Sequence, residues 1–189
     1  MPKYTTPPSL GIFSDFEVHI FLKNLILLRD KALISILWLT GARIQEVLNL
    51  TKEDILIDED YLKIRLQTLK KRRKENENKF MITYRNLEFE RDSNNIVMKE
   101  CINNIIEYYN SIAEGKLFKI SQRWAREIIN RVTTETIQKR LAAHHFRHSR
   151  FTYLAEKNIP INILLHLKGS SDLRSIVPYL QAKHIRIKF

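Results

Sequence analysis

Residues 40–50 carry the sequence TGARIQEVLNL, which follows a strongly apolar run. That run predicts a helix over residues 30–39, and the chain leaves this helix at Gly41. The chain has only 4 glycines, so a glycine here indicates a turn that the backbone makes more easily without a side chain. A further helix is expected from about Arg43 to the end of the stretch, with Glu46 one helical turn after the arginine.

Two segments precede this stretch. Residues 1–13 contain several prolines and are expected to form an extended leader or the end of a linker. Ser14 and Glu17 have the spacing of a capping box, in which each side chain satisfies a free amide of the first helical turn. We therefore expect a helix from Ser14 to about Leu28, at the start of a folded domain that covers residues 14–189.

The sequence pattern changes after residue 60. Apolar and polar residues alternate over 62–67 and again over 80–84, which is the period of a half-buried strand. The segment 69–79 between them is polar and mostly basic, as expected for the tip of a hairpin. Helices are predicted again over about 95–113, 122–132, 145–156 and 161–167, with Asn158 as a left-handed cap and Pro160 in the first turn of the last helix. The fold class is therefore mainly α with a small antiparallel β-sheet.

The composition favours a polyanionic partner. Lys and Arg number 32 against 21 for Asp and Glu, which gives a net charge of +11. Nucleic acid and an acidic membrane surface are both compatible with this charge. A solvated basic surface without any partner is the plain alternative.

The cysteine content and the apolar segments indicate the compartment. Cys101 is the single cysteine, which excludes an intrachain disulfide and is typical of a reducing compartment. The amino terminus has no secretory signal, and the longest apolar run, residues 32–40, is too short to span a bilayer. We expect a protein of the cytoplasm, associated with the nucleoid, or of the cell that hosts a virus or mobile element, with no membrane partner.

Three segments resemble the motif boxes of the tyrosine recombinases, also called the phage integrase family. The first is residues 40–50, and the second is HHFRH at residues 144–148. The third is residues 167–179, which has Gly169 in register and ends in Tyr179. The boxes occur in the family's order around a basic hairpin. The resemblance implies the fold of a tyrosine recombinase catalytic domain, and it implies that the family's amino-terminal core-binding domain is absent from this sequence.

The resemblance also implies which residues act on DNA. Tyr179 would attack phosphorus, giving a 3′-phosphotyrosyl link and a free 5′-hydroxyl. Arg43 and Arg147 would hold the non-bridging oxygens, because guanidiniums donate charged, bidentate hydrogen bonds to the negative charge of the transition state. His144 is the candidate base or proton relay, since a phenol with a pKa near ~10 needs one. Lys70 is the candidate acid that protonates the 5′-oxygen as it leaves.

Basic residues of the hairpin and of the third box are expected to bind DNA. Lys71 and Lys74 are alternatives for the acid, because the hairpin tip is longer than the simplest family pattern. Ser170 stands where the family has His or Trp, and a serine provides no ring to support the tyrosine. Lys168 or His166 are the candidate substitutes for that ring. The predicted DNA-binding residues are Lys71, Arg72, Arg73, Lys74, Lys168 and Ser170.

The activity implied is site-specific DNA recombination without a metal, ATP or another cofactor. The arginines would supply the positive charge, and the phosphotyrosine would retain the energy of the broken bond. The expected partners are double-stranded DNA and further copies of the chain, as a tetramer on DNA.

Two alternatives stay open, a type IB-like topoisomerase and a catalytically impaired DNA-binding relic of a recombinase. Each residue also has a plain structural alternative: Tyr179 as a packing side chain, Arg43 as a surface arginine, and His144 with His148 as a metal pair that lacks acidic or cysteine ligands.

Overall fold

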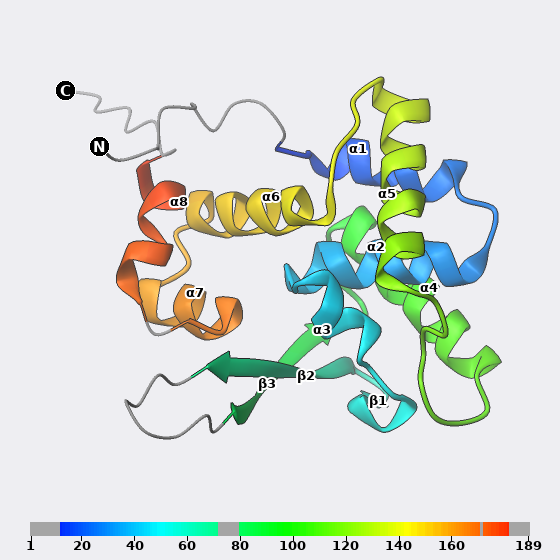
Figure 1. The fold of residues 1–189 in the computed structure, drawn as a ribbon, viewed down its shortest axis with the longest axis horizontal. Coiled ribbons are helices and arrows are strands. Elements are labelled where there is room, and N and C mark those ends of the chain that lie inside the picture. The colour runs from blue at the N-terminus through cyan, green and yellow to red at the C-terminus, as the bar shows by residue number, and fades with distance from the viewer. Residues whose placement is uncertain (1–11, 72–79, 171, 182–189) are drawn as a thin grey trace.

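The computed structural model describes residues 12–71, 80–170 and 172–181 (Figure 1). It is mainly helical with one small antiparallel sheet, as the sequence predicted. In this part of the chain, no helix combines the length and the apolar character needed to cross a bilayer. The α-helices are α1 (Asp15–Asn24), α2 (Leu28–Thr40), α3 (Ile44–Leu48), α4 (Ile96–Ser111), α5 (Gln122–Ile137), α6 (Ala143–Glu156), α7 (Ile161–Lys168) and α8 (Val177–Gln181). The 3-10 helices are η1 (Lys52–Asp54) and η2 (Leu173–Ser175), and the strands are β1 (Ile55–Ile57), β2 (Tyr61–Lys71) and β3 (Phe80–Glu90).

Helix α2 runs through the middle of the molecule (Figure 1). From Ala32 to Leu39 every side chain except Ser35 is apolar, and a helix that is apolar all round is stable only when it is surrounded. Helices α1, α3, α4 and α6 all contact it. Leu33, Leu37 and Trp38 are fully buried there, and they belong to a core that extends to the sheet and to α5.

The sheet has the order β1-β2-β3, with both pairs antiparallel. The alternation predicted for β2 is confirmed, because Leu62, Ile64 and Leu66 face the core and are almost fully buried. Strand β3 continues to Glu90, well beyond the predicted end at residue 84. Strand β1 was not predicted, because its 3 residues are too few to show a period of two.

A second, smaller cluster lies at the carboxyl-terminal end of the described chain. It joins α6 to the closing segment, the name used below for α7, η2 and α8 together. Among the described residues this cluster has five buried members: Phe151, Ala155, Leu164, Ile176 and Tyr179. Figure 1 shows α7 and α8 at one end of the molecule, and α7 also contacts β3. The closing segment is therefore attached through little apolar surface.

The helix ends agree with the sequence in part. Gly41 ends α2 in the left-handed conformation, at a φ of 58°, and Asn158 has a φ of 60°, as predicted. The predicted end of the first helix at Leu28 is wrong, because α1 ends at Asn24 and Leu28 starts the next helix. The three residues between the helices expose Ile26 and leave the helical path, which an apolar period cannot reveal. Helix α5 likewise extends past its predicted end to Ile137.

The first described residues are already part of the core. Phe13, the last residue of the predicted leader, is 3% exposed. Its ring centroid lies 5.1 Å from that of Phe21 and 4.7 Å from that of Phe146. Its backbone N–H donates to the Ser149 hydroxyl at 2.6 Å. The chain therefore enters the domain by packing across α6.

Candidate active site

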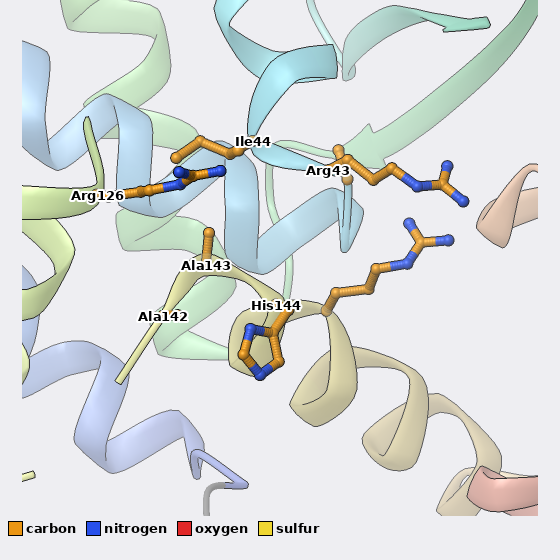
Figure 2. Close-up of a pocket in the computed structure, with 8 residues that line it drawn as sticks. Arg43, Ile44, Arg126, Ala142, Ala143 and His144 are labelled. Atoms are coloured by element: carbon orange, nitrogen blue, oxygen red, sulfur yellow. The ribbon is translucent and has the colours of Figure 1, made fainter. Parts of the chain in front are cut away.

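Two of the predicted arginines line one pocket, although more than a hundred residues separate them in sequence. Arg43 precedes α3 and Arg147 lies in the second turn of α6. The pocket has a volume of about 200 Å³, and His144 and Arg126 also line it (Figure 2). Such a hollow, with three guanidiniums and one imidazole at its edge, favours an anionic occupant. Its complete lining is Ala42, Arg43, Ile44, Arg126, Ala142, Ala143, His144 and Arg147.

Glu46 holds Arg43 in place. The Arg43 Nη1 atom donates to Glu46 Oε1 at 2.8 Å, and the Arg43 backbone N–H donates to Glu46 Oε2 at 3.0 Å. The glutamate side chain is 8% exposed, whereas the arginine side chain is 54% exposed. The arginine is therefore fixed from its buried side, and the rest of its guanidinium stays open to a ligand.

Arg147 is buried and bound to two backbone carbonyls. Its Nη1 donates to the Gly41 carbonyl at 2.7 Å, and its Nη2 donates to the Lys168 carbonyl at 2.7 Å. Burial, reinforced by the charge of Arg43, lowers the pKa of Arg147 to about 10. The side chain stays protonated at neutral pH. It therefore joins the end of α2 to the end of α7 and keeps its charge.

Tyr179 lies on α8 and is 5% exposed. Its ring packs against His148, at 5.5 Å between centroids, and against Phe151, at 5.7 Å. Burial raises the pKa of Tyr179, and the charge of Arg147 opposes that rise. The phenol is thus protonated at neutral pH, and it needs a proton acceptor before it can act as a nucleophile.

The imidazole packed against Tyr179 belongs to His148, whereas His144 lines the arginine pocket. The two imidazole rings are 5.9 Å apart, edge to face. Burial is the main cause that lowers the pKa of both histidines, which favours the neutral form that accepts a proton. His144 was the residue predicted from the sequence, and the contact of His148 with the tyrosine was not predicted, although both histidines belong to the HHFRH segment.

Lys168 contacts the tyrosine directly. Its Nζ lies 4.6 Å from the centroid of the Tyr179 ring and donates to the Ser175 carbonyl. Burial, with the charges of Arg147 and Arg43, lowers the pKa of Lys168 to about 8. Ser170, at the position of the family's ring, accepts from the Asp172 N–H at 3.2 Å. The closing segment therefore presents an ammonium group to Tyr179.

Arg85 is a residue of this region that the sequence analysis missed. It lies on β3, is 3% exposed, and donates from Nη2 to Glu46 Oε2 at 2.6 Å and from Nη1 to the Leu167 carbonyl. Burial lowers the pKa of Arg85, and the Glu46 carboxylate opposes the shift. One signal was present, because Arg85 has the same parity along the strand as the buried residues Leu87 and Phe89.

The predicted hairpin residues are described only in part. Lys70 and Lys71 lie within β2, where their backbones pair with Met81 and Phe80 of β3, and their side chains lie outside the described part of the chain. Arg72, Arg73 and Lys74 lie outside the described residues altogether. The lysine assigned as the acid is therefore located by its backbone alone.

The described residues contain no group of three or more His, Cys, Asp or Glu side chains arranged to hold a metal ion. His144 and His148 are thus a pair without a third ligand in the part of the chain that the structure covers.

Solved structures share this fold. A XerH site-specific recombinase bound to palindromic difH substrate superposes with a TM-score of 0.68, at 18% identity, over 93% of this chain and 50% of that chain. The Tn1549 transposon integrase in complex with transposon right end DNA gives 0.63, at 16% identity, over 98% and 65%. XerA recombinase gives 0.62, at 18% identity, over 98% and 61%. The fold is that of a tyrosine recombinase catalytic domain.

A sequence comparison gives the family. The model of the phage integrase family matches residues 17–185, and the chain belongs to that family. A protein of Methanocaldococcus jannaschii named "Probable integrase/recombinase protein" is 26% identical over 163 residues, which are 82% of this chain and 46% of that protein. The chain thus spans about half the length of the curated relative that it matches.

Proposed function

We propose that this chain is the catalytic part of a site-specific recombinase that cuts and rejoins DNA through a covalent bond to Tyr179. One observation carries the proposal: a buried arginine binds the backbone at Gly41, beside Arg43, and also the backbone of the segment that ends in Tyr179. This arrangement brings two guanidiniums and a phenol from three distant parts of the sequence into one region. A purely structural tyrosine would not require the arginines.

The arginines suit the transition state of phosphoryl transfer. Attack on phosphorus gives a five-coordinate state with additional negative charge on the non-bridging oxygens. Arg43 and Arg147 would each donate to those oxygens, and both are already oriented by Glu46 and by backbone carbonyls. Because their partners are fixed before DNA arrives, little reorganisation opposes the reaction.

Cleavage moves two protons, one from Tyr179 and one to the 5′-oxygen. The Tyr179 oxygen bonds to phosphorus, its proton passes to a histidine, and the bond from phosphorus to the 5′-oxygen breaks. Lys70 donates a proton to that oxygen, which leaves as a hydroxyl. We assign the acceptor to the pair His144 and His148, because one lines the arginine pocket and the other contacts the tyrosine ring. Rejoining reverses each step, so neither ATP nor a metal is required.

Lys168 supports Tyr179 in this scheme. An ammonium group on the face of the ring attracts its electrons and favours the phenolate over the phenol. This contact replaces the ring that the family has at the position of Ser170. The serine therefore does not require loss of activity.

Double-stranded DNA is the proposed partner, with a tetramer of the chain assembled on it. The net charge of +11 supports attraction to phosphates. The XerH and Tn1549 proteins named above were solved in complex with DNA. We propose a location on DNA, in the nucleoid or in the host cell of a mobile element. The hairpin residues Lys71, Arg72, Arg73 and Lys74 remain the candidate contacts to the DNA backbone.

The test uses a nicked duplex from which the cut strand diffuses away, so that the covalent complex accumulates. We expect the wild-type chain to form SDS-resistant adducts with a pool of such duplexes, and Tyr179→Phe to form none. The Phe variant should bind the pool with unchanged affinity, because only the hydroxyl is lost. Tyr109→Phe removes a hydroxyl from α4 and serves as the matched control, which should react like the wild type.

Two outcomes would contradict the proposal. Adducts formed by Tyr179→Phe would show that another residue is the nucleophile. A wild-type chain that binds the pool without any adduct would favour the DNA-binding relic, for which the missing ring at Ser170 is the supporting observation. Relaxation of supercoiled DNA without sequence preference would instead favour the topoisomerase.

A further inference from the structure

Strand β3 contacts α7 (Figure 1), and the guanidinium of Arg85, on β3, donates to the last turn of that helix. It is 3% exposed, and a charge in such a place is stable only with partners that compensate for the lost water. One partner is the carboxylate of Glu46, at 2.6 Å, and the other is the carbonyl of Leu167. These two acceptors belong to elements far apart in sequence, so the fork of one arginine connects α3 with the end of α7.

Both contacts lead directly to an arginine of the candidate site. Glu46 binds Arg43 through its other oxygen, at 2.8 Å, so one carboxylate serves two guanidiniums. On the other side, Leu167 is followed by Lys168, whose carbonyl accepts from Arg147 at 2.7 Å. An unbroken series of contacts therefore runs from Arg43 to Arg147 through Arg85.

Gly169 leaves the space that Arg85 occupies. A Cβ atom on Gly169 would lie 3.1 Å from Cδ and from Nη1 of the arginine, which is closer than ordinary contacts. The glycine also has a φ of +63°, which side chains rarely adopt. The turn after α7 is thus built directly against the Arg85 side chain, and ten residues after Gly169 the same chain reaches Tyr179.

We infer that Arg85 is a positioning residue for the proposed reaction, which fixes Arg43 and Arg147 relative to each other. The inference rests on the proposed function. Arg85 is 3% exposed, and the role inferred is indirect: it acts through Glu46 on one side and through the backbone at Leu167 on the other. A lysine has one ammonium and no fork, so it would hold one acceptor well and the other poorly.

A residue that only stabilises the fold would have the same contacts, so the test must separate the two roles. Adduct formation is compared on two nicked substrates of the same sequence. One carries the normal phosphate, and the other carries a methylphosphonate, in which a methyl group replaces one non-bridging oxygen and removes the charge. Misplacement of Arg43 should matter much less on the neutral substrate, because less charge then has to be stabilised.

We expect Arg85→Met to slow adduct formation on the phosphate by on the order of 10²-fold, as small misplacements do. The rate of adduct formation on the methylphosphonate should fall by at most about tenfold, and the affinity for DNA should be unchanged. Arg85→Lys should recover part of the rate. Arg65→Met is the control, because Arg65 lies on the neighbouring strand with a side chain 51% exposed and pairs only with Asp54 among the described carboxylates, at 2.9 Å. It removes one charge and should leave both rates unchanged.

Each outcome decides between the possibilities. Equal losses on both substrates, or a loss that follows the fraction of folded protein, would overturn the positioning role. Wild-type rates for Arg85→Met would overturn it as well, while leaving the proposed function intact. A wild-type chain that binds DNA and forms no adduct would overturn the proposed function and this inference together. Should Arg85→Met fail to fold, Arg85→Lys decides, because a positioning role requires its loss on phosphate to exceed its loss on methylphosphonate.

Discussion

Helices α2 and α7 both end at a glycine in the left-handed conformation, with φ values of 58° and 63°, yet they are held in very different ways. Ten of the 13 residues of α2 are buried, so packing fixes the helix on every side. Helix α7, all of which is described, buries Leu164 alone among its 8 residues. Arg43 thus follows a helix that is mostly buried, whereas Tyr179 follows a helix with one buried residue.

Polar contacts compensate for this difference. The end of α7 receives hydrogen bonds from Arg85 at the Leu167 carbonyl and from Arg147 at the Lys168 carbonyl. Such contacts are directional, so they define a position with little buried area. They are also lost more easily than a packed core. Arg85 and Arg147 therefore attach to the core the segment that carries the tyrosine.

The largest effect that we expect comes from weakening α2. Leu37→Ala removes a fully buried side chain and should lower the free energy of unfolding by about 2–5 kcal/mol. Urea unfolding followed by circular dichroism and by hydrogen exchange should show a single loss across the whole domain. A variant that loosened α2 while leaving α4 and the sheet at wild-type stability would show that α2 is not part of one cooperative core.

The next effect comes from the same change in α7. Leu164→Ala also removes a fully buried side chain, but its cluster is small and part of the cost can be avoided by local opening. We expect a loss of about 2 kcal/mol, at the lower end of the range for such substitutions. Hydrogen exchange should accelerate in α7 and α8 and stay unchanged in α2. Equal acceleration in both regions would mean that the molecule is one cooperative unit.

The smallest effect concerns pH and Lys168. The folded protein lowers the pKa of this lysine to about 8 from the usual 10.5, so between these values the unfolded chain holds more protons. The unfolding free energy of the wild type should therefore rise from pH 7.5 to 9.5 relative to Lys168→Met, which lacks the group. Solvent around the half-buried ammonium keeps the effect small. The check is urea unfolding of both proteins across this pH range. If their unfolding free energies changed in parallel with pH, the ammonium would be in free solvent.

The sequence predicted what depends on local pattern. The run before Gly41 gave α2, and the alternation of Leu62, Ile64 and Leu66 gave the buried face of β2. The arginines of the site followed from their motif boxes. Arg85 was not predicted as a residue of the site. The alternation of apolar residues shows which face of a strand is buried, but it does not show which side chain lies opposite that face. In the sequence, a charged residue at a buried position of a strand indicates that the strand ends there. Only the folded structure shows that Glu46 compensates the charge of Arg85.

The same limit applies to Tyr179. Its place near the end of the third box was visible, but its neighbours were not, because Lys168 and His148 reach it from two other helices. A family motif names residues by position in the chain. Contacts between side chains depend on how α6, α7 and α8 pack against one another, and the apolar pattern within each helix does not show that packing.

The hydrogen bonds of Arg147 determine which substitutions the site tolerates in evolution. Both of its acceptors, at Gly41 and Lys168, are main-chain carbonyls. Every amino acid has such a carbonyl, so a substitution at position 168 that preserves the backbone also preserves the bond. The position of this arginine therefore depends on the path of the backbone more than on the identity of neighbouring side chains. The side chain at position 168 could therefore change without replacing either partner of that guanidinium.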